Sequence, residues 1–148
     1  MDFIVLISLI ALGYFAGTFL EKRHYRSIER REKAYLHLPA ITAKNVNINE
    51  NNIREVKMVC GSAVISIDYF KRILAGLRNI FGGTVKSYET LIDRARREAL
   101  LRMKEKADDA TMIINVRIET STVGKTKRNK NVGCLEAVAY GTALFIEE

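Results

Sequence analysis

Two cysteines are the side chains of this chain with the most specific chemistry. Cys60 and Cys134 lie on or beside segments that read as strands, so they could approach one another across a sheet or between copies of the chain. Two thiolates could hold a soft metal such as Cu(I). A structural zinc site takes four Cys or His ligands and a catalytic site usually takes three protein ligands. We favour the simpler interpretation of two small buried residues, and the ligand spacing implies no cofactor.

Catalysis by either thiol would need a positioned base beside it. The two histidines, His24 and His37, both precede the segment that carries the cysteines. The pair Asp108-Asp109 follows a predicted helix, where a turn explains it. We therefore expect that the protein is not an enzyme.

Two groups of basic residues could bind an anion or a partner. Arg78 and Lys86 flank the turn Gly82-Gly83-Thr84, which precedes a predicted helix N-terminus, a common anion site; a helix stop and a new cap explain the same residues. The second group occupies the tip of a predicted hairpin and has no acidic neighbour: Lys125, Lys127, Arg128 and Lys130. Anionic lipid, nucleic acid or an acidic partner could contact this tip, or it could simply be solvated. Because most other basic residues alternate with acidic ones in a chain of net charge +7, nucleic acid is the least expected partner.

The element that precedes all these residues is an apolar segment. Phe3 to Leu20 contains eighteen residues and no charge; as a helix it would span roughly 27 Å, close to the hydrocarbon core of a bilayer. It is long for a signal peptide and follows Asp2 rather than basic residues. We expect residues 1–20 to be a transmembrane helix, with a cleaved signal or a buried core helix as alternatives.

Charge predicts the orientation of this helix. Six basic residues lie between positions 21 and 33, so the positive-inside rule places the domain in the cytoplasm and the N-terminus outside the cell (inner) membrane. Gly13 and Gly17 have the spacing that lets two membrane helices approach closely, although glycine is also simply common in such helices. Residues 21–52 are expected to form a charged juxtamembrane helix, ended near Pro39, and a linker.

Residues 53–148 are expected to form one α+β domain, with a small antiparallel sheet and helices on one face. Strand patterns cover 56–67, 112–123 and 135–146, and helical patterns cover 69–81 and 88–107. Ala95 and Ala99 on the long helix predict close packing on the sheet. The opposite face of that helix is charged and is expected to be solvated: Arg94, Arg97, Glu98 and Glu105. The last two strands are expected to form a hairpin.

The last strand is apolar on both faces. Val138, Tyr140 and Leu144 alternate with an equally apolar set of residues. A strand that is apolar on both sides predicts a second covering layer. Another copy of the chain is the natural candidate, so we expect a homo-oligomer held through these three residues and, in the bilayer, through Gly13 and Gly17.

Two segments resemble a known family. Residues 70–83, FKRILAGLRNIFGG, with Ser87-Tyr88-Glu89, are similar to the signature of the YbjQ-like family, which is often labelled heavy-metal-binding; residues 139–143, AYGTA, are similar to its closing strand. The resemblance covers about residues 54–147. It implies a dodecin-like β-α-β-β subunit that assembles into a ring, typically a homopentamer. Asn79 stands where the family usually has Asp.

Two hypotheses of function follow. The first is a membrane-anchored, ring-forming scaffold or binding protein whose contacts are with itself, the lipid bilayer and an unidentified protein partner. The second is a small-ligand or metal-binding module that uses pockets between subunits.

Overall fold

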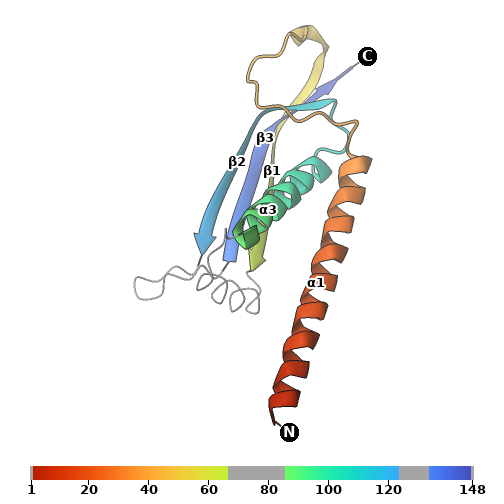
Figure 1. Cartoon of the computed structure of the whole chain (residues 1–148). Coiled ribbons are helices and arrows are strands. Elements are labelled where there is room, and N and C mark those ends of the chain that lie inside the picture. The colour runs from red at the N-terminus through yellow and green to blue at the C-terminus, as the bar shows by residue number, and fades with distance from the viewer. Residues whose placement is uncertain (1, 67–85, 124–133, 148) are drawn as a thin grey trace.

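The computed structural model describes residues 2–66, 86–123 and 134–147 (Figure 1). They form a small α+β fold, as expected, in which a long helix covers one face of an antiparallel sheet. The predicted helix over 69–81 and the tip of the predicted hairpin lie outside the described residues.

Three strands form the sheet in the order β1-β3-β2. Strand β1 spans Ile53–Ser66, β2 spans Met112–Val123 and β3 spans Cys134–Ile146, close to the predicted ranges. Strand β3 is central and pairs antiparallel with both neighbours. The strand that the sequence marks as apolar on both faces is therefore the one that is paired on both edges.

Helix α3, Lys86–Glu105, packs on the sheet through its alanine-rich stripe. Ala95, Ala99 and Met103 are fully buried, which confirms the predicted close packing. Gly61 of β1 makes the closest approach: a Cβ there would lie 2.3 Å from the carbonyl oxygen of Ala99 and 2.3 Å from the amide nitrogen of Met103. The core thus depends on small residues on both sides of the helix–sheet contact.

Helix α1 is a single element of 33 residues, Asp2–Ala34. Its C-terminal half lies beside α3, on the side of α3 remote from the sheet, and its N-terminal half extends beyond the sheet (Figure 1). Within the part of the chain that the structure describes, no helix is long and apolar enough to cross a membrane. The side chains at positions 2, 3, 6, 7, 10 and 14 of α1 lie outside that part.

The segment expected to be a linker belongs to the folded domain. Residues 39–43 run along the outer edge of β2, where the amide of Ile113 donates to the carbonyl of Pro39 and the amide of Ile41 donates to the carbonyl of Ile113, both at 2.9 Å. Strand β2 bulges at this point, between Ile114 and Arg117, and Asn115 has a positive φ of 52°, a conformation that Asn tolerates better than most residues. A short 3₁₀ helix, Glu50–Asn52, then leads into β1.

Candidate functional site

An ionic contact joins α1 to α3. Arg31 donates to Glu98 and, at 3.0 Å, to Glu105. Arg97, which directly precedes Glu98 on α3, donates two hydrogen bonds to Glu32, of 2.7 and 2.5 Å. The charged face of α3 that was expected to be solvated therefore contacts α1. That prediction was wrong for Glu98, which is buried, and for Arg97, which is half-buried, whereas Glu105 remains exposed while it pairs with Arg31. We call this set of interactions the α1–α3 clasp, with Arg31, Glu32, Arg97, Glu98 and Glu105 as its members.

Glu98 is the centre of the clasp. Its residue is only 5% exposed, and it also accepts a hydrogen bond of 2.9 Å from Arg102 Nε. Burial favours the protonated acid, but hydrogen bonds and charges from Arg31 and Arg102 outweigh it and keep the pKa of Glu98 below its ordinary value. A buried carboxylate with two guanidinium partners is stable only while both partners remain.

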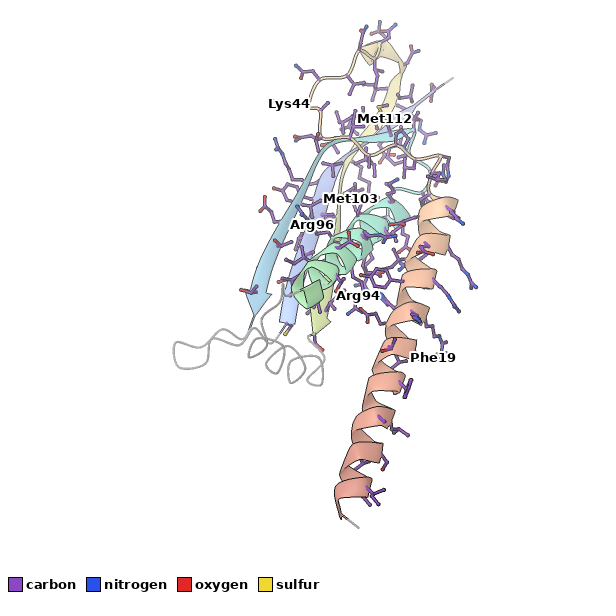
Figure 2. The ribbon with its side chains drawn as sticks, in the orientation of Figure 1. Phe19, Lys44, Arg94, Arg96, Met103 and Met112 are labelled. Carbon is purple, nitrogen blue, oxygen red and sulfur yellow. The ribbon has the colours of Figure 1, made fainter. Side chains whose placement is uncertain are left out.

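His24 lies at the edge of the clasp, with Nε2 4.0 Å from Glu98 Oε2. Burial lowers the pKa of His24, and the nearby charge of Arg94 lowers it further, while Glu98 opposes both. Arg94 lies on the side of α3 that faces α1 (Figure 2). The neutral imidazole is therefore the form that the folded helix pair favours.

Apolar and aromatic contacts complete this interface. Ile28 of α1 is fully buried, and the hydroxyl of Tyr25 donates to the carbonyl of Thr90 at 3.0 Å. The guanidinium of Arg97 lies 5.9 Å from the centre of the Tyr25 ring, within cation–π range. The C-terminal half of α1 is therefore a docked part of the domain.

The opposite face of α1 carries a basic stripe, which we define as Lys22, Arg23, Arg26 and Arg30. All four are exposed. With Phe19, Ser27 and Arg31 they line an open groove of about 720 Å³. Among the residues that the structure describes, no carboxylate forms a salt bridge with any of these four.

The face of the sheet remote from α3 is the face predicted to bind another copy. Exposed apolar side chains lie on it along β1, with Val56 58%, Met58 75% and Val64 61% exposed. Val138 and Tyr140 of β3 are half-buried. Leu144 is only 5% exposed within one chain; its side chain therefore offers little area to a second copy, and its predicted interface role needs correction.

The two cysteines lie on this same open face but at different levels. Cys60 pairs with Tyr140, whereas Cys134 pairs with Ser66, six residues away along β3. At about 3.4 Å per residue the thiols are roughly 20 Å apart, far beyond the roughly 4.6 Å that one metal ion spans between two sulfurs. One chain cannot join them through a metal, and Cys60 is exposed rather than buried as expected. Within the described ranges, no group of three or more His, Cys, Asp or Glu residues could hold a metal ion.

The structure leaves the predicted anion-binding residues undescribed. Arg78 and the hairpin residues Lys125, Lys127, Arg128 and Lys130 lie outside the described residues, and Lys86 opens α3 with an undescribed side chain. Gly13 and Gly17 lie in the apolar half of α1, and both are partly buried.

Residues 22–32 have two distinct faces that were not predicted from the sequence, a basic exposed face and a face that packs on α3. The basic stripe has the 22, 23, 26, 30 spacing of one helix face, so the pattern was available, but it was used only to orient the chain. The clasp carried no such signal, because Arg31 and Glu98 are 67 residues apart.

Comparison with known proteins finds a family model and several relatives that match the domain. A family model described as "Putative heavy-metal-binding", the YbjQ family, matches residues 40–147. A UPF0145 protein of Hahella chejuensis is 41% identical over 100 residues, which cover 66% of this chain and 89% of the relative. A UPF0145 protein of Listeria monocytogenes is 36% identical over 110 residues, 72% of this chain and 96% of the relative. The family match begins after α1 has ended.

One solved structure is also similar. It is a protein of unknown function of the DUF74 family from Pediococcus pentosaceus, with a TM-score of 0.46 and 21% identity, covering 74% of this chain and 98% of the other.

Proposed function

We propose that this chain, which belongs to the YbjQ family of UPF0145 proteins, is a membrane-anchored scaffold whose domain assembles with further copies of itself. The anchor is the N-terminal half of α1, in the cell (inner) membrane with the domain on the cytoplasmic side. The assembly is a homo-oligomeric ring formed through the sheet. The role is non-enzymatic: the ring holds a partner.

The observation that carries this proposal is the exposure of the apolar half of α1. Seven large apolar side chains there are more than half exposed: Ile4, Val5, Leu9, Leu12, Phe15, Phe19 and Leu20. Single exposed apolar residues are ordinary, but a contiguous set of this size marks an interface or a membrane segment. The apolar residues at positions 3, 6, 7 and 10, whose side chains are undescribed, extend the same uncharged run in the sequence.

The clasp fixes the orientation of the proposed anchor relative to the domain. Because Arg31, Glu32 and Ile28 fix the C-terminal half of the same continuous helix to α3, the apolar half leaves the domain in a defined direction (Figure 1). A flexible tether would not orient the domain in this way. Copies anchored in one bilayer would therefore present their sheets in a common orientation, which favours a closed ring.

Extraction of the full-length chain from cell membranes tests the anchor. We expect the chain to stay in the membrane pellet after washing with alkaline carbonate and to dissolve in mild detergent. The double substitution Leu9→Arg/Leu12→Arg should release it, because each arginine at the centre of a membrane helix costs about 3 kcal/mol of insertion free energy. Leu36→Arg, at a position 77% exposed beyond the anchor, is the control and should stay in the pellet. Release of the unmodified chain by carbonate would refute the anchor.

A second candidate function is metal binding between copies. It is favoured by the family description and by Met58 and Cys60, an exposed thioether and an exposed thiol two residues apart on the open face of β1. Both are soft ligands that suit Cu(I). Bound copper per chain, measured by elemental analysis after loading with Cu(I), should fall to background in Cys60→Ser while the oligomer persists. Equal copper in Cys60→Ser and the unmodified chain would eliminate this site.

A further inference from the structure

We infer that the basic stripe of α1 binds the phosphate groups of anionic phospholipids and so selects the lipids around the anchor. The inference rests on the proposed anchor, because the anchor is what brings the stripe to a bilayer surface. It adds a ligand class and a site.

The four basic residues of the stripe lie together on one surface of the helix. Arg26 lies four residues after Lys22 and three after Arg23, and Arg30 lies four after Arg26. These spacings of three and four make the basic side chains neighbours on one helix face. All four are exposed, and they line one groove together with Ser27 and Arg31. Guanidinium groups in such a row suit phosphate, because each presents a planar pair of N–H donors.

The other face of the helix fixes where the stripe points. Tyr25, Ile28 and Glu32 all contact or approach α3, and they lie opposite the stripe on the helical wheel. The helix cannot rotate to pair its basic residues with the domain without breaking the clasp. The stripe therefore stays directed away from α3.

Continuity with the apolar run favours a lipid phosphate over a free anion. The stripe begins two residues after Leu20, where the uncharged segment ends. Phe19, 66% exposed, lines the same groove and lies on the part of α1 that extends beyond α3 (Figure 2). An aromatic ring at this level is typical of the membrane–water interface.

Distance along the helix ranks the four residues. At about 1.5 Å per residue, Lys22 and Arg23 lie within about 5 Å of the end of the apolar run along the axis, Arg26 about 9 Å and Arg30 about 15 Å. Electrostatic attraction to a charged bilayer surface decays over about 8 Å at physiological salt. Lys22 and Arg23 should contribute most, Arg26 less and Arg30 least.

The test uses the full-length chain in nanodiscs of phosphatidylcholine with a minor fraction of phosphatidylglycerol. The chain is then released in mild detergent. Native mass spectrometry counts how many molecules of each of the two lipid species remain bound to it. Each basic residue close to an anionic surface strengthens attraction roughly fivefold. We therefore expect the ratio of phosphatidylglycerol to phosphatidylcholine among the bound lipids to exceed the ratio in the disc by about tenfold or more. Lys22→Gln/Arg23→Gln/Arg26→Gln should remove the enrichment.

A variant with the same change of charge elsewhere is the control. Lys44→Gln/Lys57→Gln/Arg96→Gln alters three exposed residues away from the stripe, two of which are seen in Figure 2, and should keep the enrichment. In the unmodified chain, raising the salt concentration should weaken it.

Four results would overturn the inference. A chain that enters the nanodisc without enrichment, or whose enrichment survives loss of the stripe, would refute the lipid site and leave the anchor standing. Enrichment that inorganic phosphate abolishes, but chloride of equal ionic strength does not, would assign the stripe to free phosphate. A chain that does not enter the nanodisc would refute both the anchor and the inference.

Discussion

Glu98 shows at the scale of one residue how the helix pair is held. Its carboxylate is nearly buried and is bound by Arg31 and Arg102. In Glu98→Gln the charge that both guanidinium groups need is lost, so we expect the free energy of unfolding to fall by about 2–3 kcal/mol. Chemical denaturation measures this change. Glu119→Gln, on an exposed part of β2, should alter it by less than about 0.5 kcal/mol. An equally small effect at Glu98 would show that the clasp contributes little.

The titratable groups of the clasp predict how stability depends on pH. The pKa of Glu98 is lowered by its guanidinium partners, so its stabilising contribution is present above the unfolded pKa and is lost as the pH falls through the folded pKa. Burial lowers the pKa of His24; the unfolded chain therefore takes up a proton near pH 6.5 before the folded chain does, and stability also falls there on acidification.

Both groups therefore lower the stability of the helix pair as the pH falls, and His24 has its effect at the higher pH. Thermal unfolding followed between pH 7.5 and about pH 5 should show a decline that is shallower in His24→Gln. His37→Gln is the control, since this exposed histidine lies outside the clasp. Identical slopes in the unmodified chain and His24→Gln would contradict the assigned role of His24.

At the scale of single residues, the sequence predicts those features that a local pattern of residues determines. The buried alanines of α3 follow from helical spacing, and they were predicted. The pairing of Arg31 with Glu98, and the six-residue offset between Cys60 and Cys134, depend on how distant elements are placed, and one sequence carries no local signal for either.

At the scale of elements, the contact of β1 with α3 depends on Gly61. A side chain there would meet the backbone of Ala99 and Met103 at 2.3 Å, and a backbone cannot yield as the end of a flexible side chain can. Gly61→Ala should lower the free energy of unfolding by about 3 kcal/mol or more. Ser62→Ala, at the exposed neighbouring position, should be nearly neutral in the same denaturation experiment. Equal stability of the two variants would mean that α3 moves away from β1 without cost.

The elements themselves were largely predictable. Three strands and the long helix followed from periods of two and of about 3.6 residues. The segment 39–43 was not assigned to the domain, because it is short and lies between a helix-ending proline and an Asn-rich stretch; it is held by hydrogen bonds to the edge of β2. Helix α1 follows the predicted continuation of the apolar segment into charged residues, but its docking on α3 was not foreseen, because a row of alternating charges is equally typical of a solvated helix.

At the scale of the whole molecule, the open face of the sheet is the proposed contact between copies. A charge at Leu144 would not test it, because that side chain is buried within one chain and the variant would unfold. Val64→Asp, at an exposed position of the open face, should dissociate the oligomer while the monomer keeps its fold. Thr120→Asp, exposed on the other side of the sheet, should leave the oligomer intact. Native mass and circular dichroism together separate dissociation from unfolding.

The central claim, an anchored chain that assembles with itself, is tested most directly by a native mass spectrum. The full-length chain is taken from the washed membrane fraction and released in mild detergent. We expect a species at a small-integer multiple of 16.8 kDa, with five as the multiple that the family resemblance implies. A single chain of 16.8 kDa in that spectrum, or a chain that is absent from the membrane fraction, would contradict the account.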